Sequence, residues 1–170
     1  GLSPKENREI PALNYGRVYR LKQRHPELTV VINGGIENHV EMQRHLMHVD
    51  GVMLGRAAYH TPWILHEVDS LIFGENVAAA SPLDIVERMK PYISQELARG
   101  VWLQNITRHM LGLFHGLPGG RLWRRVLSEQ ACRPGAGLEV LDEAAEKVRS
   151  AAVQRLHAPR PAPTPALAPG

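Results

Sequence analysis

The sequence predicts an α/β fold that passes into an all-helical region. Two short apolar runs, at residues 28–32 and 51–54, each stop at glycine and predict strands. A helical pattern from His39 to about His48 lies between them, with Asn38 as its expected cap, which completes a βαβ unit. No strand pattern follows residue 55. The expected class is therefore α/β, continued by helices.

Each remaining element has a local signal. Residues 15–24 form an expected short amphipathic helix that ends before Pro26. The nearly continuous apolarity of the strand at 28–32 predicts burial on both faces, as in a parallel sheet. Further helices are predicted at 62–73, 82–99, 101–115, 120–132 and 138–156. The Ala- and Pro-rich end of the chain predicts a disordered or extended tail.

Strand counting bears on the domain organisation. Two parallel strands cannot form a sheet that is covered on both faces, and each would leave an edge exposed. We therefore expect the remaining strands upstream of Gly1, in an N-terminally truncated α/β domain over residues 1–76. A helical domain is expected over 77–157, and a disordered tail over 158–170.

Composition narrows the class of protein. The single cysteine, Cys132, excludes a disulfide framework and a Cys-rich zinc site, and it fits a reducing cytoplasm. No stretch approaches 18 apolar residues, so no membrane span is expected. His45 and His48 lie three residues apart without an H-E-x-x-H pattern, so no metal site is expected.

The charges are unevenly distributed along the chain. Residues 1–25 hold six Lys/Arg against two acids, and residues 101–133 hold five Arg against one acid, whereas the segment between them is acidic. Two basic segments indicate a polyanionic partner such as nucleic acid. Solvated helix faces would give the same distribution.

Glycine-containing loops follow both predicted strands. Asn33-Gly34-Gly35 and Gly55-Arg56 lie at the same carboxyl edge of the sheet. Glycine lets backbone N–H groups approach an oxyanion closely, and a helix N-terminus adds its dipole. In β/α barrels the loops after the last two strands often bind phosphate, so these loops predict a phosphate site if the strands are the seventh and eighth. Tight strand-to-helix turns would explain the glycines equally.

Arginines cluster on the helix predicted at 120–132. Arg121 shares a helix face with Arg124, three residues on, and with Arg125, four residues on, while Leu122 and Val126 are expected to turn to the core. Arginine pairs phosphates bidentately. Trp123 could stack on a base or fill the core. A solvated basic face is the plainer interpretation. Lys5 and Arg8 form a second basic pair.

Five segments of the chain resemble the tRNA-dihydrouridine synthases, and in particular their A subfamily. They are GLSPKENREIP (1–11), INGGI (32–36), DGVMLGRAAY (50–59), ITRHMLGL (106–113) and WRRVLSE (123–129). The resemblance covers roughly residues 1–150. It implies that residues 1–76 are the C-terminal end of a β/α (TIM) barrel that carries FMN, and that residues 77–157 are a helical tRNA-binding domain.

The resemblance also implies a reaction and site residues. The family reduces D-loop uridines of tRNA, here expected at positions 20 and 20a, and NADPH is the hydride donor through FMN. The FMN phosphate and tRNA would be held by separate groups of residues: Asn33, Gly34, Gly35, Gly55 and Arg56 for the phosphate, and Lys5, Arg8, Arg121 and Arg124 for tRNA. The family's acid is a cysteine that Cys132 does not match. We expect it upstream of Gly1, so no catalytic residue is assigned in this chain.

Two other functions fit parts of the pattern. The glycine loops also suit an FMN-dependent β/α-barrel oxidoreductase with a small-molecule substrate. The basic helical region also suits a non-catalytic RNA-binding module. We expect a cytoplasmic, monomeric protein that by itself neither retains FMN tightly nor reduces uridine.

Overall fold

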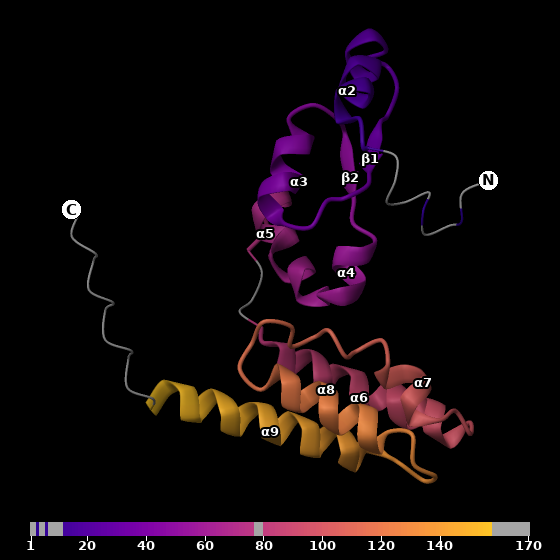
Figure 1. The fold of residues 1–170 in the computed structure, drawn as a ribbon, viewed down its shortest axis with the longest axis vertical. Helices are drawn as coiled ribbons and strands as arrows, with labels where there is room; N and C mark the ends of the chain where they lie inside the picture. Colours follow the sequence, from indigo (N-terminus) through magenta and orange to yellow (C-terminus); the bar gives the residue numbers. More distant parts are fainter. Residues whose placement is uncertain (1–2, 4–5, 7–11, 77–79, 158–170) are drawn as a thin grey trace. The chain divides into compact units, whose positions relative to one another are not determined.

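The computed structural model describes residues 3, 6, 12–76 and 80–157. The chain divides into two compact units between Ala80 and Ser81, and each is considered by itself. The described residues are mostly helical, with two short parallel strands (Figure 1). The first unit is the α/β unit, and the second is the helical unit.

The α/β unit contains the predicted βαβ arrangement. Its elements are α2 (Tyr15–Arg24), β1 (Val31–Asn33), α3 (His39–Leu46), β2 (Gly51–Met53), α4 (Arg56–His60), the 3-10 helix η1 (Pro62–Glu67) and α5 (Val68–Phe73). Asn38 caps α3 as predicted, because its Oδ1 accepts the Glu41 N–H at 2.9 Å. Asn14 caps α2 in the same way, by accepting the Arg17 N–H at 3.0 Å.

The two strands pair in parallel and end together. Val31 lies opposite Gly51, and Asn33 lies opposite Met53, the last residue of β2. This register brings the loops that follow β1 and β2 to one edge of the pair, where the glycine-containing segments lie.

The core of the α/β unit lies on one face of the strand pair. Ile32 packs there with Ile36, Met42 and Val49, and α2 adds Tyr15, Val18 and Tyr19 around them. The prediction of strands buried on both faces is wrong for the described residues, because Val31 is 57% exposed and Met53 is 53% exposed. Successive side chains of a strand point to opposite faces, and the packing given by α2 and α3 is on the Ile32 side.

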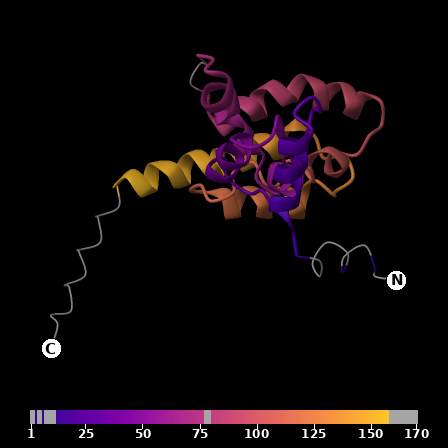
Figure 2. The same ribbon diagram turned by 90° about the horizontal axis from the view of Figure 1, so that it is seen from above.

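The helical unit contains α6 (Pro82–Ala98), α7 (Leu103–Thr107), α8 (Gly120–Gln130) and α9 (Leu138–His157). Ser81 and Asp84 form a capping box at the start of α6. The helices α8 and α9 pack side by side in both views (Figures 1 and 2). The core of the unit contains its largest fully buried side chains, which are Trp123, Ile93, Leu103, Leu141, Val86 and Thr107.

Two of the predicted helices are wrong in extent. The segment 62–73 is divided into η1 and α5. The helix expected at 101–115 is confined to α7, and turns follow it. Beyond α7 the segment packs around the buried Trp123, whose Nε1 donates to the Met110 carbonyl at 2.9 Å and whose ring packs on Phe114. Tertiary packing thus overrides the local helical pattern.

Candidate functional site: an anion-binding pocket and a basic helix

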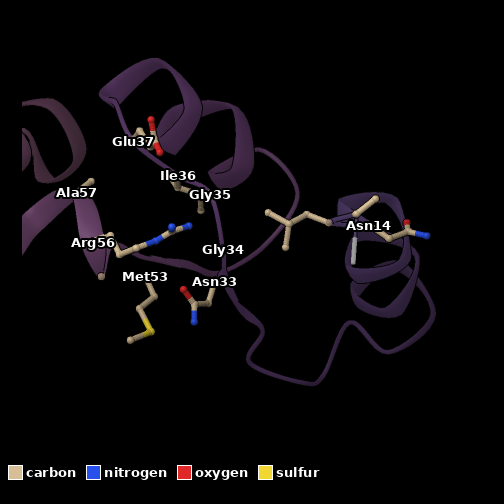
Figure 3. Close-up of a pocket in the computed structure, with 12 residues that line it drawn as sticks. Asn14, Asn33, Gly34, Gly35, Ile36, Glu37, Met53, Arg56 and Ala57 are labelled. Atoms are coloured by element: carbon tan, nitrogen blue, oxygen red, sulfur yellow. The ribbon is translucent and has the colours of Figure 1, made fainter. Parts of the chain in front are cut away.

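All five residues predicted to bind phosphate line one pocket of the α/β unit. Asn33, Gly34 and Gly35 come from the loop after β1, and Gly55 and Arg56 come from the segment after β2 (Figure 3). The pocket has a volume of about 510 Å³. The parallel register explains their meeting, since Asn33 and Met53 are opposite one another at the ends of the strands.

The glycines of this pocket have structural reasons to be glycine. Gly34 and Gly35 have φ values of +119° and +65°, in the region that disfavours side chains. A Cβ on Gly35 would lie 2.9 Å from a methyl of Leu13 and 3.0 Å from the Tyr15 hydroxyl oxygen. By contrast, a Cβ on Gly55 would meet no atom within 4 Å, so Gly55 leaves open space beside Arg56.

The polar groups of the pocket suit an oxyanion. Figure 3 shows the Arg56 side chain extending toward the Gly34–Gly35 segment, with the Asn33 amide close by. A guanidinium, an amide and the backbone of a glycine pair are donors that bind phosphate oxygens. Glu37 also lines the pocket, on the side opposite Met53. The helix α4 has only five residues, so its dipole is small. The attraction of this pocket for an anion would therefore come more from the charge of Arg56 than from the helix dipole.

The arginines of α8 lie on its exposed side. Arg121, Arg124 and Arg125 are exposed, and Arg125 forms an ion pair with Glu129 at 3.0 Å. Within the described part of the chain, neither Arg121 nor Arg124 has an ion-pair partner. These two guanidinium groups are therefore available to an external anion.

Trp123 belongs to the core of the helical unit and not to this exposed face. It is 0% exposed, and its indole N–H is used by Met110, which excludes base stacking. Val126 is buried as predicted, but Leu122 is 40% exposed, so the prediction that Leu122 turns to the core is wrong. Cys132 is exposed and lies just beyond the end of α8.

Two other pairs of residues considered in the sequence are Lys5 with Arg8 and His45 with His48. Lys5 and Arg8 lie outside the described residues. His45 and His48 do not form part of a metal cluster, since no three His, Cys, Asp or Glu side chains of the described residues converge as ligands. His45 is instead buried beneath α2, where its Nδ1 lies 2.6 Å from the Tyr19 hydroxyl.

Sequence reasoning missed two residues that lie close to the glycine loop. Leu13, which also lines the pocket, leaves no room for a side chain there, since a Cβ on Gly34 or Gly35 would lie within 3.0 Å of its methyls. Tyr15 donates a hydrogen bond to the Gly34 carbonyl at 2.8 Å. The amphipathic pattern of 15–24 marks Tyr15 only as an apolar-face residue. No local signal connects it to a loop 19 residues away.

Among the described helices, none combines the length and apolarity that a bilayer crossing requires. The fold and the two polar surfaces define a class: an α/β unit whose paired parallel strands end at a pocket lined by glycines and Arg56, followed by a helical unit with a basic face. The family model of dihydrouridine synthase (Dus) matches residues 1–151, and the chain belongs to this family.

Three similar proteins carry the name tRNA-dihydrouridine(20/20a) synthase. The chain is 55% identical over 148 residues to the tRNA-dihydrouridine(20/20a) synthase of Vibrio parahaemolyticus, a match that covers 87% of this chain and 45% of that protein. It is 56% identical over 148 residues to the synthases of the same name from Salmonella typhimurium and Escherichia coli K12, covering 45% and 43% of them. The chain thus spans less than half the length of these curated relatives.

Proposed function

We propose that the chain is part of a tRNA-dihydrouridine synthase of the A subfamily, which reduces uridines 20 and 20a of tRNA in the cytoplasm with FMN and NADPH. The observation that carries this proposal is the pocket. Five residues from two loops of a dihydrouridine synthase chain meet at the carboxyl ends of paired parallel strands. The strands are then the seventh and eighth of the family's β/α barrel, where a phosphate site is common.

The residues present fit the phosphate of FMN. The space that a Cβ on Gly55 would fill is open, and Arg56 supplies a positive charge beside it. Arg56 and Asn33 would hold the phosphate oxygens together with backbone N–H groups of Gly34 and Gly35. When bound, FMN supplies the hydride chemistry by which a uracil 5,6 double bond is reduced.

The basic side of α8 fits the backbone of tRNA. Arg121 and Arg124 are exposed and lack an ion-pair partner among the described residues, so binding a phosphate costs neither of them an internal contact. Contacts to phosphates position a nucleic acid without reading its sequence. Arg121 and Arg124 would therefore orient the tRNA and set which uridine is presented, and Lys5 and Arg8 would add contacts from the other basic segment.

A chimera tests this function. The chain replaces the segment that it matches in the E. coli synthase, and the chimera is expressed in a strain that lacks this synthase. We expect dihydrouridine to return at positions 20 and 20a of tRNA, as mapped by mass spectrometry. Arg56→Ala should lower the dihydrouridine level by weakening flavin retention. Arg99→Ala should not, because Arg99 is an exposed residue just after α6 that pairs with Glu96. A folded, flavin-loaded chimera that restores dihydrouridine only at other positions would contradict the proposal.

A further inference from the structure

Tyr15 links the start of α2 to the glycine loop of the pocket. Its hydroxyl donates to the carbonyl of Gly34 at 2.8 Å, across 19 residues of sequence. A Cβ added to Gly35 would come within 3.0 Å of the same hydroxyl oxygen, so the loop and the tyrosine are in close contact. Tyr15 is half-buried, which shields this hydrogen bond from competing water.

The hydrogen bond fixes the direction of a backbone donor. The Gly34 carbonyl and the Gly35 N–H belong to one planar trans peptide, so they point in opposite directions. When Tyr15 holds the carbonyl toward α2, the Gly35 N–H faces away from α2. Figure 3 shows Arg56 on that side of the loop, opposite Asn14 at the start of α2.

Glycines alone would leave this peptide free to rotate. Gly34 and Gly35 both have positive φ values, and glycine populates several backbone regions at similar cost. A hydrogen bond to the linking carbonyl selects one of these orientations before any ligand arrives. Such preorganisation lowers the entropy cost of binding.

The ring of Tyr15 is itself held in place. His45 packs edge-on against it, with ring centroids 4.5 Å apart. His45 is 4% exposed and lies 2.6 Å, Nδ1 to Oη, from the Tyr19 hydroxyl. Tyr15 therefore reaches the loop from a fixed aromatic cluster of α2 and α3, here named the aromatic support and made up of Tyr15, Tyr19 and His45.

We propose that Tyr15 is a positioning residue of the anion pocket: it orients the Gly34–Gly35 peptide so that the Gly35 N–H and the Arg56 guanidinium address the same phosphate group. This inference rests on the proposed function, which places the phosphate of a flavin nucleotide in that pocket. Tyr15 acts through the backbone and does not touch the phosphate.

The test titrates the 170-residue chain with inorganic phosphate and follows the backbone amide NMR signals of Gly34 and Gly35, with chloride added at matched ionic strength as the reference. Tyr15→Phe removes the hydroxyl and keeps the ring against His45. Loss of one hydrogen bond should raise the half-saturating phosphate concentration about two- to tenfold. Tyr92→Phe is the matched control, because Tyr92 is 50% exposed on α6 in the helical unit.

Arg56→Ala separates this inference from the proposed function. If phosphate shifts the Gly35 signal in the wild-type chain and in Tyr15→Phe equally, while Arg56→Ala abolishes the shift, the pocket binds phosphate and the role of Tyr15 is overturned. If phosphate shifts no backbone amide signal of Gly34 or Gly35 in the wild-type chain, both the phosphate site and the Tyr15 inference are overturned.

A melting curve of each variant distinguishes positioning from simple stability. A merely structural tyrosine would lower the melting temperature of Tyr15→Phe without changing the phosphate titration of the folded protein, which overturns the inference. Should Tyr15→Phe not fold, the same titration is made with Tyr15→Leu, which also removes the hydroxyl and keeps an apolar side chain at this position. A raised half-saturating phosphate concentration there supports the hydrogen bond as the positioning contact, and wild-type affinity overturns it.

Discussion

The α/β unit and the helical unit are built on cores of very different size. Among the described residues, four apolar side chains are buried in the α/β unit, which are Ile32, Ile36, Met42 and Val49, whereas the helical unit buries fifteen. The side chains of Val31 and Met53 on the strands remain more than half exposed. Among the described residues, the unit that holds the glycine-loop pocket therefore has the smaller apolar core, and the basic α8 rests on the larger one.

Because of this difference, we expect the stability of the fold and the shape of the pocket to depend on different contacts. A helix that is fixed by a large core can present arginines from a rigid surface. A glycine loop over a small core depends on individual contacts, such as the hydrogen bond from Tyr15 to Gly34, to hold its shape. Substitutions should therefore unfold the helical unit through its core and should impair the pocket through single polar contacts.

The largest effect is expected from Trp123→Ala. Trp123 is 0% exposed, packs on Phe114 and donates to the Met110 carbonyl, so its removal leaves a cavity and loses a buried hydrogen bond. Such losses cost about 3–5 kcal/mol. Denaturation of the chain followed by circular dichroism should show this loss in the helical unit, while the α/β unit keeps its midpoint. The control Trp102→Ala, 50% exposed, should cost about 1 kcal/mol or less. A smaller loss of unfolding free energy for Trp123→Ala than for Trp102→Ala would contradict the idea that the large core stabilises the helical unit.

Met42→Ala should have the next largest effect, confined to the α/β unit. Met42 is 3% exposed in the small core, and truncation of a buried methionine costs about 2–5 kcal/mol. The amide signals of Gly34 and Gly35 report this unit during a urea titration. Met47 lies at the end of the same helix and is 74% exposed, so Met47→Ala should change the free energy of unfolding by less than about 0.5 kcal/mol. Equal effects of the two substitutions would show that this core contributes no stability.

The smallest effect concerns pH and the aromatic support. Burial lowers the pKa of His45 below its usual value, against the opposing charge of Glu41 and with added effects of Arg44 and His48. The folded state then binds fewer protons than the unfolded state. The stability that neutral His45 contributes is therefore complete above the unfolded pKa of about 6.5 and decreases as the pH falls toward the lower folded pKa.

Urea midpoints of the α/β unit between pH 7.5 and pH 5 check this dependence. The wild-type midpoint should fall with decreasing pH, and His45→Asn should flatten the curve. His60→Asn is the control, because His60 is exposed at the end of α4 and is not among the groups that shift the pKa of His45. A wild-type midpoint that rises as the pH falls would contradict the assignment of His45 as a buried neutral imidazole.

The sequence predicts the pocket because its residues follow strands. Parallel strands place their carboxyl ends at one edge, so Asn33-Gly34-Gly35 and Gly55-Arg56 could be brought together from two apolar runs and their glycines alone. The same holds for α6, α8 and α9, which begin where predicted, at Pro82, Gly120 and Leu138.

What the sequence does not predict depends on contacts between distant residues. The segment after Thr107 has a helical pattern, yet it forms turns in place of a helix. In that segment the Met110 carbonyl accepts a hydrogen bond from the indole of Trp123. The hydrogen bond from Tyr15 to Gly34 likewise exists only after α2 has packed on the strands. Periodicity reports which side of an element is apolar, and it carries no information on which distant group a hydroxyl or an indole reaches.

The salt dependence of tRNA binding tests most directly the claim that the exposed arginines of α8 form the RNA interface. Unmodified tRNA is titrated with the wild-type chain and with Arg121→Ala plus Arg124→Ala at several salt concentrations, with Arg99→Ala as the paired-arginine control. Losing two phosphate contacts should weaken binding more than about tenfold and reduce the slope of log K against log salt by about 1.5. Arg99→Ala should keep the wild-type slope. Equal slopes and affinities for the wild-type chain and the double variant would contradict the claim.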